Sequence, residues 1–338
     1  MHIDLRETEL RLKRTWTISR GAADSKRNLF VRLEEDGITG EGEAACQAAF
    51  GESPESVRAA LERTAGRLHG CDPAQVDGLD IGGAARAALE MALLDWNAKR
   101  AGAPLGIFLG VPPPAAPVVT SYSLGIDRPG VMAAKVAEAR PFGVLKVKLG
   151  APGGGDRAIV DAIRAVTDVP LRIDANGGWQ SVDEAARMID WLAEEHRGVQ
   201  FIEQPLPMGR LEETARLKAR SALPLVADED VRVAADLPAL ADCYHGINIK
   251  LMKAGGVREA RTLAGAARSA GMHIMIGCMI ESSLGIAAAL HLASLADWID
   301  LDGHLLLAND PYTGIGGEDG RLVPPTAPGI GVQPATPQ

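Results

Sequence analysis

The chain has 338 residues, enough for one large domain or two moderate ones. Hydrophobic residues make up 46% of it and charged residues 23%, the proportions of an ordinary soluble globular protein. The formal net charge is −9 and the Lys and Arg residues are scattered, so we expect no nucleic-acid partner.

No part of the sequence looks like a membrane or export segment. No stretch reaches about 18 uninterrupted apolar residues, the length of a transmembrane helix. The opening MHIDLRETEL lacks the basic and then apolar regions of a signal peptide. Cys46, Cys71, Cys243 and Cys278 are widely spaced without a C-x-x-C pair, which favours reduced thiols. We therefore expect a cytoplasmic protein with no membrane partner.

The first region, residues 1–112, combines strands and helices. Strand-like segments cover residues 3–18 and 29–34, and helical patterns follow, one of them starting near Ser53 and another covering residues 84–99. Strands followed by helices predict an α+β unit, which we interpret as an N-terminal capping domain.

A proline-rich linker, VPPPAAP at 111–117, leads into short apolar runs that alternate with helical segments from residue 118 to about 302, and we expect the catalytic barrel domain to span residues 113–310. Seven helical stretches separate eight short apolar runs. The runs are residues 118–124, 144–148, 171–174, 199–203, 225–228, 246–250, 273–277 and 298–302. This alternation predicts an α/β fold, a (β/α)7β modified TIM barrel, with an open doubly wound sheet as the alternative.

The tail, about residues 311–338, is rich in Gly and Pro. We expect it to return to the N-terminal region and complete the capping domain, and to fray beyond Val323.

Ionisable residues stand at the ends of the apolar runs. They are Lys146 and Lys148, Asp174, Glu203, Asp228, Lys250, and the pair Asp300 and Asp302. From Lys148 to Lys250 the successive spacings are 26, 29, 25 and 22 residues, each about one βα unit. The side chains should therefore stand on neighbouring strands at the C-terminal end of the barrel, where the active sites of this fold are built.

Three of these residues suit a hard divalent cation. Asp174, Glu203 and Asp228 offer converging carboxylate oxygens, the ligands that Mg²⁺ prefers. Lys148 and Lys250 would face each other across that point, as two bases must if they invert one carbon between them. Crowding by cations and the metal should lower a lysine pKa towards neutrality. A single Asp or Lys at a strand end is commonly only a helix cap. Six such residues stand at the ends of five successive runs, and chance does not explain so regular a placement. They are Lys146, Lys148, Asp174, Glu203, Asp228 and Lys250.

At these positions the sequence resembles the enolase superfamily, in its muconate-lactonizing subgroup, and most closely the dipeptide epimerases of the L-Ala-D/L-Glu type. The matching motifs are KVK at 146–148, DAN at 174–176, EQPL at 203–206, ADED at 227–230 and NIKLMKAGG at 248–256, with RG at 20–21, GEGE at 40–43 and GES at 51–53. The resemblance covers nearly the whole chain.

The resemblance implies a role for each residue. Asp174, Glu203 and Asp228 are expected to bind Mg²⁺, the implied cofactor. Lys148 and Lys250 are expected to be the two acid/base groups of a 1,1-proton transfer at the α-carbon of the C-terminal residue of a dipeptide. The third lysine, Lys146, is expected to stabilise the enediolate intermediate. Barrel enzymes of this kind often associate, so a homo-oligomer is also expected.

Further substrate contacts follow from the same resemblance. Asp300 and Asp302 are expected to bind the ammonium group of the dipeptide, although they could instead pair with nearby lysines. Phe50, Cys278, Met279 and Glu281 are expected to line the substrate pocket, with a core role as the alternative for Phe50 and a structural role for Glu281.

One position departs from the best-known members of the subgroup. Members that prefer an acidic second residue carry an arginine just after the RG motif, where this chain reads GAAD at 21–24. Lys26 or Arg27 could substitute for it. The expected lid comprises residues 16–27 and 50–52, reaching over the barrel mouth.

Other functions use the same residue types. An N-acyl amino-acid racemase, an o-succinylbenzoate synthase or a cycloisomerase would share the lysines and the metal, but their substrates lack an ammonium group for Asp300 and Asp302. A Schiff-base lyase could use a barrel lysine without needing three carboxylates. A barrel that only binds a metal–ligand complex would not need two facing bases.

Overall fold

The computed structural model describes residues 1–336. An antiparallel sheet begins the chain, with β1 (His2–Ile18), β2 (Gly21–Glu35) and β3 (Ile38–Ala44) in that order. Helices α1 (Pro54–Ala65) and α2 (Gly83–Arg100) follow, and α3 (Leu105–Phe108) ends this part. An added Cβ at Gly40 or Gly42 would lie 2.0 Å from a backbone oxygen of α2, so the GEGE motif lets β3 pack directly on that helix.

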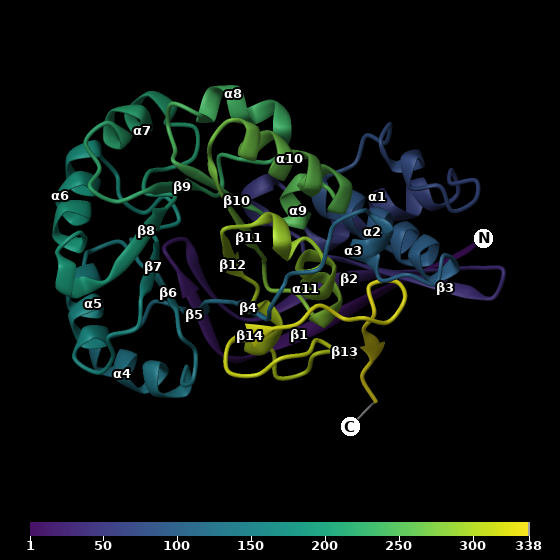
Figure 1. Cartoon of the computed structure of the whole chain (residues 1–338), viewed down its shortest axis with the longest axis horizontal. Helices are drawn as coiled ribbons and strands as arrows, with labels where there is room; N and C mark the ends of the chain where they lie inside the picture. The colour runs from purple at the N-terminus through teal and green to yellow at the C-terminus, as the bar shows by residue number, and fades with distance from the viewer. Residues whose placement is uncertain (337–338) are drawn as a thin grey trace.

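The remainder forms a parallel barrel (Figure 1). Its strands are β5 (Tyr122–Leu124), β6 (Leu145–Lys148), β7 (Leu171–Asp174), β8 (Val199–Glu203), β9 (Leu225–Ala227), β10 (Gly246–Ile249), β11 (His273–Gly277) and β12 (Trp298–Asp300). They form one sheet in chain order, and a bridge between Thr120 and Ile299 joins its two edges. The barrel prediction is confirmed, and the doubly wound alternative is wrong.

Within residues 1–336, helices connect each barrel strand to the next. They are α4 (Pro129–Glu138), α5 (Asp156–Arg164), α6 (Val182–Leu192), α7 (Leu211–Lys218), α8 (Leu237–Leu240), α9 (Leu251–Ala254) with α10 (Val257–Ser269), and α11 (Ser283–Leu290). Nothing among the helices of this described part has the length and apolarity that crossing a membrane requires.

Helix α2 joins the two parts of the chain. Met91 and Leu94 pack into the barrel core, whereas Leu89 and Leu93 pack into the core under the N-terminal sheet. A helix that is apolar on nearly all sides is stable only when buried on all of them. The N-terminal part is therefore fixed against the barrel through a shared helix.

The prediction that the tail frays beyond Val323 is wrong. Ile330 and Val332 are buried, and the Ile330 N–H donates to Asp95 Oδ1 on α2 at 2.7 Å. Two short pairings also hold the tail: β14 (Arg321–Leu322) with β4 (Val118–Val119), and β15 (Gln333–Pro334) with β13 (Tyr312–Thr313). The tail is ordered because two apolar side chains are buried and a backbone N–H bonds to a buried carboxylate. These interactions offset the conformational entropy that a Gly- and Pro-rich segment loses on folding.

The expected lid, residues 16–27, is the end of the β1–β2 hairpin. In Figure 1 the purple hairpin extends from the N-terminal part to the side of the barrel that carries β7. At its tip, Ser19 Oγ and Arg20 Nη1 donate to the backbone oxygen of Asn176, just after β7, at 3.2 and 3.1 Å. The hairpin thus lies over the C-terminal ends of the barrel strands.

Candidate active site

Sheet register brings the ionisable residues to one end of the barrel. Lys148, Asp174 and Glu203 are Cα partners across β6, β7 and β8. Asp228 and Lys250 directly follow β9 and β10. Because parallel strands end at one rim, residues about one βα unit apart in sequence meet in space.

Asp174, Glu203 and Asp228 form a compact, buried group of carboxylates. One oxygen from each can be chosen so that all lie within 4.8 Å of one another. Burial, and then the charge of Asp174, raise the pKa of Glu203 to about 8. Three buried carboxylates at this separation repel one another, and a divalent cation would remove that cost. The donor set therefore fits Mg²⁺.

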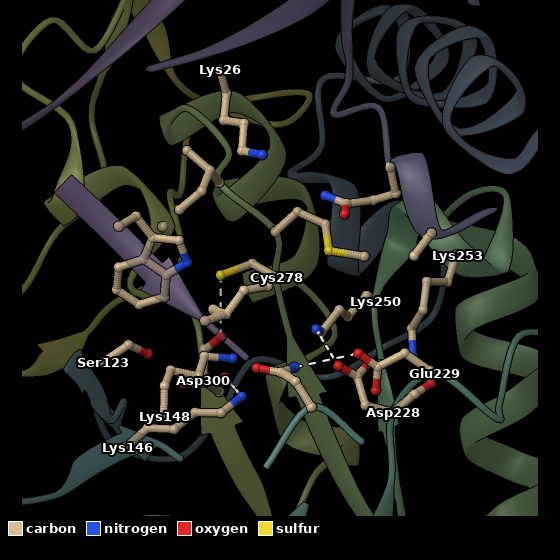
Figure 2. Close-up of a pocket in the computed structure, with 18 of the residues that line it drawn as sticks. Lys26, Ser123, Lys146, Lys148, Asp228, Glu229, Lys250, Lys253, Cys278 and Asp300 are labelled. Atoms are coloured by element: carbon tan, nitrogen blue, oxygen red, sulfur yellow. Dashed lines mark hydrogen bonds and ion pairs between the residues drawn. The ribbon is translucent and has the colours of Figure 1, made fainter. Parts of the chain in front are cut away.

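Lysine side chains lie close to all three carboxylates; Figure 2 shows Lys146 and Lys148 on the side of Asp300, and Lys250 beside Asp228. Lys146 Nζ lies 2.8 Å from Glu203 Oε2 and 3.1 Å from Asp174 Oδ2. Lys148 Nζ lies 2.6 Å from Asp174 Oδ2, and Lys250 Nζ lies 2.8 Å from Asp228 Oδ2. Strands β6 and β10 are four places apart in the eight-strand order, so Lys148 and Lys250 reach the site from opposite sides.

The electrostatics of Lys250 differ from the expected lowering of a lysine pKa. Burial is the largest single influence and favours the neutral amine, but the charges of Asp228, Glu203 and Asp174 together outweigh it, so the pKa of Lys250 lies above its usual range. The predicted lowering of the lysine pKa assumed a bound metal ion. A cation held by the carboxylates would remove part of their attraction for the Lys250 ammonium and so lower its pKa.

Two residues near the triad were missed from the sequence. Lys253 Nζ donates to Asp228 Oδ1 at 2.6 Å, and Asn248 Nδ2 donates to Glu203 Oε1 at 2.8 Å. Both fix carboxylates that face the centre of the site. The sequence offered a signal for both residues. Asn248 lies on β10, two residues before Lys250, and Lys253 lies three residues after it, about one helical turn, so both side chains are expected near that of Lys250.

A second missed feature fastens the hairpin. Arg20 Nη2 lies 2.6 Å from Glu229 Oε1, and Asn176 Nδ2 donates to the same oxygen at 3.3 Å. Glu229 is buried and directly follows Asp228 in the ADED motif. The hairpin tip is therefore tied to the barrel loops that follow β7 and β9.

Asp300 lies across the site from Asp228 (Figure 2), and Asp302 follows it two residues further along the chain. Asp300 Oδ2 accepts from Lys146 Nζ at 2.7 Å, so one member of the pair does contact a nearby lysine. Asp302 Oδ2 accepts from the Ser123 N–H at 2.6 Å and forms no ion pair within residues 1–336. Burial, and then the charge of Asp300, raise the pKa of Asp302 to about 7. Asp302 is therefore a buried carboxylate that has no cationic partner among the described residues, 1–336.

The pocket includes most of the other expected residues. Phe50, Cys278 and Met279 line it, together with Trp16 and Ile18 of the hairpin. Glu281 is not part of the lining: it is buried, and its Oε1 accepts from the Met279 N–H at 2.7 Å. Since its neighbour Ile280 does line the pocket, a one-residue difference decides which side chain faces the pocket.

The structure settles which basic residue of the hairpin reaches the pocket. Lys26 lines it and points into it from β2 (Figure 2). Arg27 points away and pairs with Glu7 at 3.1 Å and Glu55 at 2.7 Å. Neighbouring strand residues face opposite sides of a sheet, so only one of the two can face the site.

Comparisons with known proteins agree with this fold. Residues 3–110 match the N-terminal domain of the mandelate racemase / muconate lactonizing enzyme family, and residues 131–338 match the enolase C-terminal domain-like family. The chain belongs to the mandelate racemase/muconate lactonizing enzyme family. The resemblance to the enolase superfamily is thereby confirmed.

Individual members of the family are similar over their whole length. An L-Ala-D/L-amino acid epimerase from Pedosphaera parvula is 41% identical, with 97% of each chain covered. A substrate-liganded L-Ala-D/L-Glu epimerase from Bacillus subtilis superposes with a TM-score of 0.94 at 29% identity, covering 99% of each chain. A dipeptide epimerase from Enterococcus faecalis V583, complexed with Mg and L-Leu-L-Tyr, gives a TM-score of 0.90 at 32% identity over 98% of each chain.

Glu281 makes the stability of this family member depend on pH. Burial, and then the charge of Glu43, raise its pKa to about 8. Its contribution is fully present below the unfolded pKa of about 4.5 and is lost as pH rises through about 8, since the folded state must then hold a buried charge. Glu281→Gln should therefore lose less stability than the wild type between pH 5 and pH 9, by roughly 1.4 kcal/mol per unit of pKa shift at most.

The measurement is urea unfolding at the two pH values. Glu318→Gln, at an exposed position, is the control and should follow the wild type. An equal loss of stability in Glu281→Gln and the wild type would contradict a protonated Glu281.

Proposed function

We propose that the protein is a Mg²⁺-dependent dipeptide epimerase that inverts the α-carbon of the C-terminal residue. The observation that carries this is the position of Lys148 and Lys250 on opposite sides of a buried three-carboxylate site. Beyond it lies Asp302, a carboxylate that forms no ion pair in the part of the chain that the structure describes. Full-length relatives named as epimerases of dipeptides support it.

Asp174, Glu203 and Asp228 would hold Mg²⁺, which when bound would draw negative charge onto the substrate carboxylate and acidify the α-carbon. Lys146, beside Glu203, would donate to the same carboxylate as its charge grows. One of Lys148 and Lys250 would remove the α-proton, and the other would deliver a proton to the opposite face. The hairpin and Phe50 would exclude water during the transfer.

The ammonium group of the dipeptide would bind beside Asp302. A substrate ammonium supplies the positive charge that this buried carboxylate lacks. Substrates of N-acyl amino-acid racemases, the nearest alternative function, have no such group. Four free cysteines also fit the reducing cytoplasm, where we place the protein.

Asp302→Asn should lower kcat/KM for dipeptides about 100-fold, because a charged hydrogen bond to the ammonium is lost. Turnover of N-acetylated dipeptides should change little. In the wild type, kcat/KM for free dipeptides should fall as pH drops below about 7, where the Asp302 carboxylate becomes protonated. Steady-state kinetics on both substrate types test this, and equal losses on both would exclude ammonium recognition by Asp302.

Lys26 should favour substrates with an acidic side chain. Within residues 1–336, the other cations lining the pocket, Arg20 included, contact carboxylates, whereas Lys26 has none. Lys26→Met should lower the ratio of kcat/KM for L-Ala-L-Glu to that for L-Ala-L-Leu about 10- to 100-fold. Arg27→Met, which removes the neighbouring charge outside the pocket, should leave the ratio unchanged. An unchanged ratio in Lys26→Met would refute the assignment.

A further inference from the structure

A second cavity adjoins the active site at its Asp302 end. The pocket between the lysines has a volume of about 110 Å³, and the adjoining cleft has about 610 Å³. Trp16, Ser123 and Leu306 line both. Sites for small ligands commonly enclose about 300–1,000 Å³, so the inner pocket alone is small for a dipeptide. The cleft supplies the missing space.

An irregularity in β1 creates this cleft. Arg11 pairs with Ser25 and Trp16 with Ala23, so residues 12–15 of β1 lie opposite the single residue Asp24 of β2. The extra residues bend the strand, as a β-bulge does. The bent segment forms one wall, and β5 with α4 forms the other.

The charged groups of the cleft already contact polar groups of the protein, Arg14 and Lys135 in ion pairs with carboxylates and Lys13 in a hydrogen bond to a backbone oxygen. Arg14 donates through Nε to Glu138 Oε2 at 2.7 Å. Lys135 Nζ lies 3.2 Å from Asp127 Oδ2, and Lys13 Nζ donates to the Leu305 backbone oxygen at 2.8 Å. The rest of the lining includes Leu12, Tyr122, Leu124 and Leu306. An uncharged side chain would bury apolar surface here without breaking an ion pair.

Ser123 connects the cleft to the expected ammonium site. Its N–H donates to Asp302 Oδ2, and the residue lines both cavities. Figure 2 shows Ser123 on the Asp300 side of the site, away from Lys250 and Asp228. A substrate ammonium held at Asp302 would place its own α-carbon beside Ser123, at the mouth of the cleft.

We propose that this cleft is the subsite for the side chain of the N-terminal residue, and that the enzyme prefers dipeptides in which that side chain is large and uncharged. This inference rests on the proposed dipeptide epimerase function. Leu, Met, Phe and Tyr side chains fit the cleft, whereas Ala leaves it filled with water.

The first test compares kcat/KM for L-Ala, L-Leu and L-Phe joined to the same C-terminal L-Glu, read as deuterium uptake in D₂O with Mg²⁺. L-Leu and L-Phe substrates should exceed the L-Ala substrate by at least about tenfold. Turnover of the L-Ala substrate without this gain overturns the subsite and leaves the epimerase function intact. Absence of exchange on every dipeptide overturns both.

The second test fills the cleft. Thr15→Trp should lower the Leu/Ala ratio of kcat/KM by at least about fivefold, because the indole would occupy the space of the substrate side chain. Thr15→Val loses the same hydrogen bond to Asp24 Oδ1 without filling the cleft, and should keep the wild-type preference. An unchanged ratio in Thr15→Trp, or better turnover of L-Ala-L-Ala-L-Glu than of L-Leu-L-Glu, would overturn the assignment.

Discussion

Lys148→Ala and Lys250→Ala should each lower the rate of epimerisation by at least about a thousandfold, because each removes one of the two groups that transfer the α-proton. Both amines lie against carboxylates, Asp174 and Asp228, on opposite sides of the site. Neither variant can remove a proton on one face and return one on the other.

A finer outcome separates a two-base site from a single base. Each variant retains one of the two expected acid/base lysines, so it should still exchange the α-proton of one epimer with D₂O without inverting it. The two variants should act on opposite epimers. Proton NMR in D₂O on separate L,L and L,D dipeptides measures both properties, and Lys218→Ala on α7 is the control. Exchange of the same epimer by both variants would rule out opposite roles.

Glu203→Gln should lower kcat/KM by on the order of a thousandfold, because it removes one of three anionic oxygen ligands of the expected metal. It should also weaken Mn²⁺ binding measured by calorimetry. Asn248 Nδ2 can still pair with the amide oxygen, so the local packing is retained. The cost of burying the Glu203 charge disappears in this variant.

Thermal unfolding separates the two effects. Mg²⁺ should raise the melting temperature of the wild type, because ligands that bind the folded state stabilise it, and should raise that of Glu203→Gln much less. Above pH 8 without metal, the variant should be at least as stable as the wild type, because the raised pKa of Glu203 costs the folded state stability there. Glu212→Gln, exposed on α7, is the control. Equal stabilisation of Glu203→Gln and the wild type by Mg²⁺ would exclude Glu203 from the metal site.

The barrel and the centre of its site could be predicted from the sequence. Apolar runs spaced about one βα unit apart dictate a parallel barrel, and in such a barrel the last residue of each strand must lie at one rim. Asp174 and Glu203 end their strands, and Asp228 and Lys250 follow theirs directly, so the geometry of these residues follows from local order alone.

Features that depend on contacts between distant segments were less accessible. The tail beyond Val323 is held by Asp95 of α2, more than 200 residues away, which no local pattern reveals. The choice of Lys26 over Arg27, and of Ile280 over Glu281, depends on strand register and loop conformation at single-residue precision. A shift of one residue reverses the side that each side chain faces.

The sequence by itself determined the fold class, the three carboxylates and the two facing lysines, because a period of βα units and the chemistry of strand ends fix them. Only the tertiary structure decided that Lys253 and Asn248 hold the carboxylates, that the hairpin is fastened by Arg20 and Glu229, and that a cleft opens beside Asp302. Those features arise where the N-terminal part packs on the barrel, or where a buried charged group contacts a partner from another segment of the chain. Their free energy depends on three-dimensional proximity, which spacing along the chain does not encode.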